Sequence, residues 1–281
     1  RHTRYISVTG VQTCALPIYR RGRAGHRAVP ATDYLTMTAT SAAENPGDPF
    51  QDPALVNATD GVITVWSDIG CPWASLALHT LRSRVLQRDI DVAIDHRAFP
   101  LELFNKRGTP KGIIDVEVTA IAGLVPALGW QPWTAPDWQY VVSTVPAMAA
   151  VQAAKALSVG GLRASDELDH ALRQAFYIHG RSISVHSEIL AAAAGCPSLY
   201  LPALESALEQ GRGYAEVFTH WHTAAALPVQ GSPHLFVKDH YAEHNPGVRY
   251  HWTARPGEGF PRFEEYDEKW ADEAIDAVLA S

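Results

Sequence analysis

Residues 62–81 read VITVWSDIGCPWASLALHTL, and this stretch decides how the rest of the chain is interpreted. Val62 to Ser67 is a short run of β-branched and aromatic residues, which predicts a buried strand. From Cys71 onward the apolar residues recur at helical spacing, so a helix is expected to begin there. Residues 89–99 then alternate apolar and polar positions, which predicts a second strand. A strand, a helix and a strand in such quick succession form a βαβ unit, in which the two strands are parallel.

The remaining segments extend this pattern. Residues 109–227 are predicted to be almost entirely helical, residues 229–245 predict a β-hairpin, and residues 261–280 predict an amphipathic closing helix. The expected fold class is therefore α/β, with a βαβ unit first, a long helical insertion, and two strands and a helix at the end. In this interpretation residues 61–108 and 228–281 form one domain, into which the helical residues are inserted.

The first 36 residues differ from the rest in composition. Val8 to Ile18 reads VTGVQTCALPI, which matches the translation of a common sequencing-adapter oligonucleotide, and the arginines that follow lack the apolar segment of a secretory signal. We interpret residues 1–36 as an artefactual leader ahead of a true start at Met37, and residues 37–60 as a flexible N-terminus. The leader holds six arginines and one aspartate, so the rest of the chain carries a formal charge of −12 in place of −7.

Charge and cysteine content exclude several classes of function. An acidic chain without a cluster of Lys and Arg after Met37 is not expected to bind nucleic acid. No run of 18 apolar residues lacks a charge, so no membrane span is predicted.

Outside the leader only Cys71 and Cys196 remain, too few for a disulfide framework, and the cytoplasm is the expected location. Cys196 is interpreted as a buried, inert cysteine. Neither a phosphate loop nor metal-ligand spacing among the histidines is found, so no bound cofactor and no metal are expected.

Cys71 is the candidate nucleophile. At a helix N-terminus the unpaired N–H groups and the helix dipole favour negative charge, which lowers a thiol pKa below its usual value of ~8.5. Pro72 suits the first helical turn, and Trp73 is expected to give the site an exposed apolar rim. Ser75 could hydrogen-bond the thiolate or act as an ordinary cap. Asp68 could tune the thiolate or cap the turn before the helix. The alternative for Cys71 itself is a small buried hydrophobic residue.

The order of the elements, with CPWA at residues 71–74 and GSP at residues 231–233, resembles the DsbA-like thioredoxin-fold family, especially its cytoplasmic FrnE-type branch. The resemblance implies a thioredoxin fold with a long all-helical insertion. It matches Cys71 to the nucleophile, and it matches Ser232 and Pro233 to a cis-proline loop whose backbone pairs with substrate. An ordinary trans turn is the alternative for Pro233. The residues expected to contact substrate or thiol are Pro72, Trp73, Ala74, Ser75, Ser232, Pro233 and His234, of which His234 could instead point into the sheet.

Ala74 departs from the family's pattern, because a dithiol enzyme has its second cysteine there, one helical turn after the first. A methyl group cannot resolve a mixed disulfide, so a thiol must arrive from outside. We expect a low-molecular-weight thiol of the glutathione or mycothiol type as cosubstrate. The expected function is a thiol-disulfide oxidoreductase with a single catalytic cysteine, acting on small thiols or disulfide-bearing substrates as a monomer or homodimer.

Two alternatives remain. Kappa-class glutathione transferases and 2-hydroxychromene-2-carboxylate isomerases share the implied fold and also lack the dithiol. They usually have Ser at the position of Cys71, so this cysteine favours redox chemistry. The other alternative is a catalytically degenerate protein that binds a thiol compound or a partner without turnover.

Overall fold

The computed structural model describes residues 52–280, and the expectations for residues 1–36 and for the start of the flexible N-terminus lie outside that range. None of the helices in the described range is both long enough and apolar enough to cross a bilayer. In chain order the elements are β1 (Val62–Ser67), α1 (Pro72–Gln87), β2 (Ala93–Ala98), α2 (Leu101–Asn105), α3 (Lys111–Leu124), η2 (Pro126–Leu128), η3 (Asp137–Gln139), α4 (Val145–Ala154), α5 (Gly161–Tyr177), α6 (His186–Ala193), α7 (Leu201–Glu209), α8 (Tyr214–Ala226), β3 (His234–Val237), β4 (Tyr241–His244), β5 (Val248–Trp252), β6 (Pro261–Tyr266) and α9 (Lys269–Leu279).

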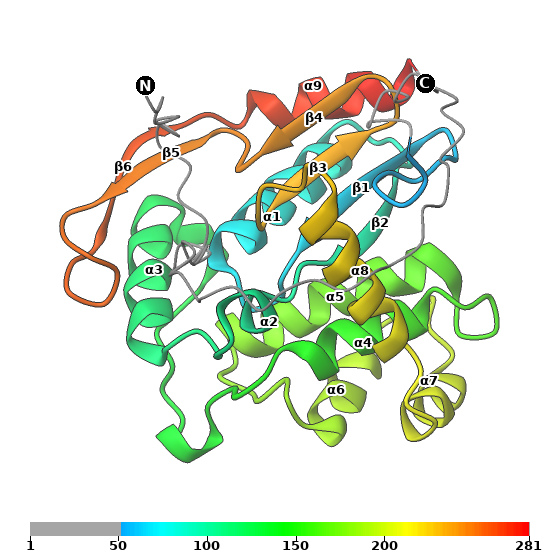
Figure 1. The fold of residues 1–281 in the computed structure, drawn as a ribbon, viewed down its shortest axis with the longest axis horizontal. Helices are drawn as coiled ribbons and strands as arrows, with labels where there is room; N and C mark the ends of the chain where they lie inside the picture. Colours follow the sequence, from blue (N-terminus) through cyan, green and yellow to red (C-terminus); the bar gives the residue numbers. More distant parts are fainter. Residues whose placement is uncertain (1–51, 281) are drawn as a thin grey trace, which may run out of the picture.

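Four strands form the central sheet in the order β2-β1-β3-β4 (Figure 1). β1 and β2 are parallel, with Val62 opposite Ala93 and Ser67 opposite Ala98, which confirms the predicted βαβ unit. β3 is antiparallel to both β1 and β4, so the hairpin predicted within residues 229–245 is also confirmed. Every residue of β1 is buried, because it is a central strand with helices on both faces.

The two faces of the sheet are covered by different helices. Successive residues of a strand point to opposite faces, so Ile63 and Trp66 of β1 face different layers. Ile63 packs in one hydrophobic cluster with Leu78 of α1 and Ile275 of α9. Trp66 packs in another cluster with Ala224 of α8. This arrangement, with βαβ first and ββα last, is a thioredoxin fold.

The helices between β2 and β3 build most of a further hydrophobic cluster, and α4 to α7 occupy the lower half of the molecule in Figure 1. Nine of the ten residues of α4 are buried, and most of them are alanines that let neighbouring helices approach closely. A Cβ at Gly213, where φ is +87°, would lie 1.9 Å from the carbonyl oxygen of Ala149, so this crossing requires glycine. α8 contacts both α4 and β2, and it therefore joins the insertion to the sheet.

The C-terminal segment differs from the predicted helix over residues 261–280. Its first part forms β6, which pairs antiparallel with β5, and only α9 is helical. Tyr250 of β5 and Phe263 of β6 pack inward while charged neighbours such as Arg249 and Glu264 are exposed, which is the period of a strand. The helical prediction is wrong over the length of β6, because the apolar residues there also fit a helical spacing.

Residues 37–60 are expected to be flexible, but the end of this segment packs against the fold. Leu55 and Val56 are buried. The indole N–H of Trp66 donates to the carbonyl oxygen of Leu55 at 2.8 Å, and the backbone N–H of Asn57 donates to Oγ1 of Thr64 at 2.8 Å. A buried tryptophan requires an acceptor for its N–H, and composition alone does not show that this segment supplies it.

Candidate active site

Cys71 is the N-cap of α1, with an extended backbone at φ −89° and ψ 112°. β1 brings the chain to this point, and Pro72 begins the helix at a position whose N–H would have no helical partner. The backbone N–H of Ala74 donates to Sγ of Cys71 at 3.4 Å. This N–H and the positive end of the helix dipole both stabilise a thiolate at Cys71 in the reduced protein.

Cys71 is fully buried, and in this structure it is disulfide-bonded. Its sulfur therefore accepts hydrogen bonds here but does not donate them. The thiol and the thiolate discussed below belong to the reduced protein.

The loop before β3 lies directly against Cys71. The peptide bond between Ser232 and Pro233 is cis. The carbonyl oxygen of Ser232 is 3.2 Å from Sγ of Cys71, and its Oγ accepts the backbone N–H of Asp68 at 2.9 Å. The structure thus brings together the two motifs, 161 residues apart, on which the sequence prediction of the site depends.

His234 follows this loop, and its ring is buried. Nδ1 accepts the backbone N–H of Gln230 at 3.1 Å. Burial, and then the neighbouring His244, lowers the pKa of His234 to about 3, so the ring is neutral at ordinary pH. This hydrogen bond holds the loop that leads into β3. Contact between His234 and substrate stays a prediction.

Asp68 holds the turn between β1 and α1. Its Oδ1 accepts the backbone N–H of Gly70 at 2.8 Å, and its Oδ2 accepts that of Leu101 at 2.9 Å. Burial of the carboxyl nevertheless raises its pKa to about 6. The sequence left two roles open for Asp68, which are tuning the thiolate and capping the turn before the helix. These contacts show the capping of the turn.

The hydroxyl of Ser75 is engaged away from the sulfur of Cys71. Its Oγ donates to the carbonyl oxygen of Cys71 at 3.0 Å and accepts from Nη1 of Arg173 at 2.7 Å. Of the two roles left open for Ser75, this structure does not show the contact with the sulfur. The hydroxyl of a helical serine readily reaches the carbonyl oxygen one turn earlier, and here it does so.

Arg173 of α5 is the main site residue that the sequence does not reveal. Besides Ser75, it donates to the carbonyl oxygen of Asp68 at 3.2 Å and to Oγ of Ser67 at 2.9 Å. Two further hydrogen bonds of 2.9 Å join it to the buried Asp169. The inserted helices therefore hold the turn that carries Cys71. The spacing of Asp169 and Arg173 indicates a helical ion pair, but it does not show which loop the pair faces.

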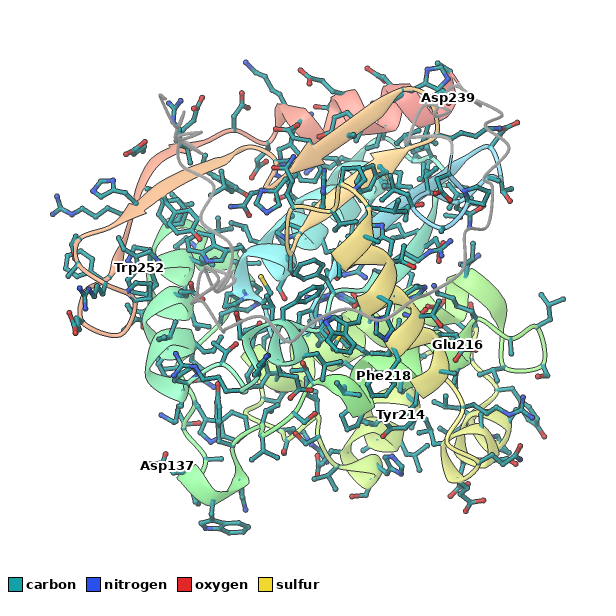
Figure 2. The ribbon with its side chains drawn as sticks, in the orientation of Figure 1. Asp137, Tyr214, Glu216, Phe218, Asp239 and Trp252 are labelled. Atoms are coloured by element: carbon teal, nitrogen blue, oxygen red, sulfur yellow. The ribbon has the colours of Figure 1, made fainter. Side chains whose placement is uncertain are left out.

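Trp73 is buried, with 1% of its surface exposed, and the expectation of an exposed rim is wrong. Its ring stacks on Tyr250 at a centroid distance of 3.8 Å, and its Nε1 donates to Oε1 of Glu117 at 2.9 Å. The hairpin of β5 and β6, which the sequence pattern does not predict, covers the indole. Trp252, labelled in Figure 2, belongs to the same hairpin and packs near α3.

Cys196 lies apart from this arrangement, in the cluster formed by the inserted helices. It is free, and its thiol donates to the carbonyl oxygen of Ala192 at 3.8 Å. Burial, and then the charge of Glu167, raises the pKa of Cys196 to about 11. A thiol with so high a pKa is a poor nucleophile at neutral pH, which fits the expected inert cysteine.

His96, Asp166 and Asp169 each place one ligand atom within 4.8 Å of the others, as metal ligands would. Arg82 already binds Asp166 and Asp169 at 2.6 and 2.7 Å, and Arg173 also binds Asp169. A cation would have to compete with two guanidinium groups. We therefore interpret this cluster as an ion-pair network between α1, β2 and α5 and assign no metal to it.

Comparison with known proteins supports the fold. No protein-family model matches the chain, and no curated protein matches it in sequence. A probable DsbA oxidoreductase from Streptomyces coelicolor is similar in structure, with a TM-score of 0.53 and 18% identity over 78% of this chain and 90% of that one. A putative protein disulfide isomerase from Nitrosomonas europaea has a TM-score of 0.50 and 12% identity over 78% and 97% of the two chains. The chain shares the fold of these DsbA-like structures.

Proposed function

We propose that the protein is a thiol-disulfide oxidoreductase that acts through the single thiol of Cys71. The observation that carries this proposal is the position of Sγ, which receives the N–H of Ala74 at 3.4 Å and faces the carbonyl oxygen of Ser232 at 3.2 Å. The fold shared with a probable DsbA oxidoreductase and a putative disulfide isomerase supports the same class of activity. In this proposal the backbone around Pro233 pairs with the substrate beside the sulfur.

The proposed reaction consists of two thiol-disulfide exchanges. The thiolate of Cys71 attacks one sulfur of a substrate disulfide, forms a mixed disulfide and releases the other sulfur as a thiolate, which takes up a proton. An external thiolate then attacks the mixed disulfide and regenerates the thiolate of Cys71. For a substrate joined to glutathione, the products are the substrate thiol and oxidised glutathione, so one disulfide is broken and one is formed.

The second exchange requires an external thiol because of Ala74. This buried residue occupies the position one helical turn after Cys71, and its methyl group cannot attack a disulfide. Cys196 has a raised pKa and lies in another hydrophobic cluster. We propose a low-molecular-weight thiol of the glutathione or mycothiol type as cosubstrate, and a cytoplasmic location in which such thiols are abundant.

Intact-mass spectrometry of the reduced protein tests the proposal. After incubation with oxidised glutathione, peptide mapping should place a glutathionyl adduct on residue 71, which Cys71→Ser lacks and Cys196→Ser keeps. Excess glutathione should remove the adduct and regenerate the thiol. An adduct on Cys196 alone, or no adduct on Cys71, would overturn the proposal. Turnover of an isomerase or transferase substrate by Cys71→Ser would favour the alternative enzymes.

A further inference from the structure

A cavity of about 770 Å³ lies between β2 and the helices α4, α7 and α8. None of the residues of the candidate active site lines it. Its polar side includes Asp95 and Arg97 of β2, Lys155 after α4 and His220 of α8. Its apolar side includes Val159 and Ala207. A cavity of this size with an apolar wall and a few converging polar groups is typical of a site for a small organic molecule.

Two donors face each other in this cavity. The buried His220 accepts the backbone N–H of Ala98 at Nδ1, at 3.2 Å. Burial, and then the positive charge of Lys155, lowers the pKa of His220 to about 3, so the ring is neutral. A neutral ring whose Nδ1 accepts a hydrogen bond carries its proton on Nε2. Nη1 of Arg97 lies 3.5 Å from this Nε2, and a guanidinium nitrogen can only donate.

An acceptor placed beside Arg97 and His220 would satisfy both donors. An oxygen with negative charge would do so best, because charge-assisted hydrogen bonds are roughly twice as strong as neutral ones. The two nitrogens thus point to an oxyanion as the chemical group that this end of the cavity recognises.

The charge of the cavity favours the same group. Asp95 accepts from Nε of Arg97 at 2.8 Å and also from Nζ of Lys155, so one carboxylate is shared by two cations. Among the described lining residues, Arg97, Lys155 and Arg212 are cationic, and Asp95 and Glu216 are acidic, which leaves one positive charge uncompensated. Glu216, labelled in Figure 2, is exposed on α8.

We propose that this cavity binds a small organic anion, with its carboxylate or phosphate oxygens at Arg97 and His220 and its apolar body against Val159 and Ala207. The site is separate from Cys71, and the proposal does not depend on the oxidoreductase activity.

Isothermal titration calorimetry with benzoate, phenyl phosphate and uncharged benzamide as probes tests this site. We expect at least one anion to bind at least 10-fold more tightly than benzamide. Arg97→Gln should weaken that binding at least 10-fold. Arg249→Gln, which removes the same charge from the exposed surface of β5, should leave it unchanged. A preference for benzoate or for phenyl phosphate identifies the acidic group.

A second variant keeps the test decisive if Arg97→Gln does not fold. Ala207→Trp should fill the apolar side of the cavity without removing a charge and abolish binding, whereas Ala191→Trp, at an exposed position of α6, should bind as the wild type does. In the wild type the NMR signal of Nε2 of His220 should shift with the anion but not with benzamide. Equal affinity for benzamide, no binding of either anion, or undiminished binding by Ala207→Trp would overturn the proposal.

Discussion

The carbonyl oxygen of Ser232 lies 3.2 Å from the sulfur of Cys71. In the reduced protein this oxygen would accept a hydrogen bond from the neutral thiol, whereas the N–H of Ala74 and the helix dipole favour the thiolate. A thiol is a weak donor, and a hydrogen bond to a charged acceptor is roughly twice as strong as one between neutral groups. We therefore expect the thiolate to be favoured at Cys71.

The first prediction is that the two described cysteines of the reduced protein differ in reactivity. Cys71 should be alkylated with a midpoint below the ordinary thiol pKa of ~8.5, because its sulfur lies at the start of α1. Cys196 should react only at higher pH, because burial raises its pKa to about 11. The rate of iodoacetamide labelling as a function of pH, followed by peptide mapping, measures both midpoints.

Two variants control this experiment. Cys196→Ser should keep the low-pH labelling, and Cys71→Ser should lose it. If Cys71 labels with a midpoint at or above that of an ordinary thiol, the carbonyl oxygen of Ser232 outweighs the N–H of Ala74 and the activated-thiol interpretation is wrong.

The second prediction concerns Asp68 and pH. Its pKa is raised from 3.8 to about 6 in the folded protein, so the stability that its protonated form contributes is fully present below pH 3.8 and is lost as the pH rises through 6. At 1.36 kcal/mol per pKa unit, the wild type should lose up to about 3 kcal/mol of unfolding free energy relative to Asp68→Asn between pH 4 and pH 8.

Urea denaturation of both proteins across this pH range measures the effect. Asp68→Asn should be the less stable protein at pH 4, because an amide has one acceptor oxygen for the two N–H groups of Gly70 and Leu101. Asp91→Asn, which removes a carboxylate at an exposed position, serves as the control. A wild type that gains stability relative to Asp68→Asn as the pH rises would contradict the raised pKa.

The elements that carry Cys71 and Pro233 could be predicted because they depend on local patterns. The β-branched run of β1, the proline at the first position of α1 and the apolar residues of β3 each indicate their structure within a few residues. The contact of Ser232 with Cys71 followed only from the resemblance to a family. Arg173 could not be foreseen, because it reaches Ser67 across 106 residues and a single sequence shows no such pairing.

The hairpin of β5 and β6 shows a different limit. The aromatic residues between Tyr250 and Tyr266 fit a strand of alternating faces as well as part of a helix. What selects the strand is the stacking of Tyr250 on Trp73, a tertiary contact between distant segments. The predicted exposure of Trp73 failed for the same reason.

The third prediction concerns Arg173, the buried arginine that binds the turn before α1. Arg173→Met should lower the unfolding free energy by about 3 kcal/mol or more, because it leaves Asp169 with one fewer cation and removes the donors to Ser67 and Asp68. It should also change the pH midpoint for alkylation of Cys71, since the turn that carries the sulfur loses its support. Thermal and urea denaturation, with the labelling assay, measure both effects.

Arg163→Met is the matched control, because Arg163 lies on the same helix and its ion pair with Glu167 is exposed on the arginine side. We expect it to cost less than about 1 kcal/mol, as exposed pairs usually do, and to leave alkylation unchanged. Equal effects of the two substitutions would show that Arg173 does not hold the turn.

The fourth prediction is that Ala74→Cys creates a motif that closes on itself. The backbone N–H of Ala74 is 3.4 Å from the sulfur of Cys71, so a thiol on residue 74 would lie close to that sulfur. Under mild oxidant the reduced variant should lose two thiols without gaining adduct mass, and peptide mapping should place the bond between residues 71 and 74.

Turnover distinguishes this variant from the wild type. With a dithiol reductant the rate should rise, because resolution of the mixed disulfide becomes intramolecular. With a monothiol the rate should fall or stay constant, because the new thiol competes for the mixed disulfide at Cys71. Ala77→Cys is the control, since this buried residue of α1 lies six positions from Cys71 and should form no bond to it. If Ala74→Cys likewise forms no bond, the sulfur of Cys71 does not lie beside the first turn of α1 in solution. The proposed exchange chemistry would then lose its structural basis.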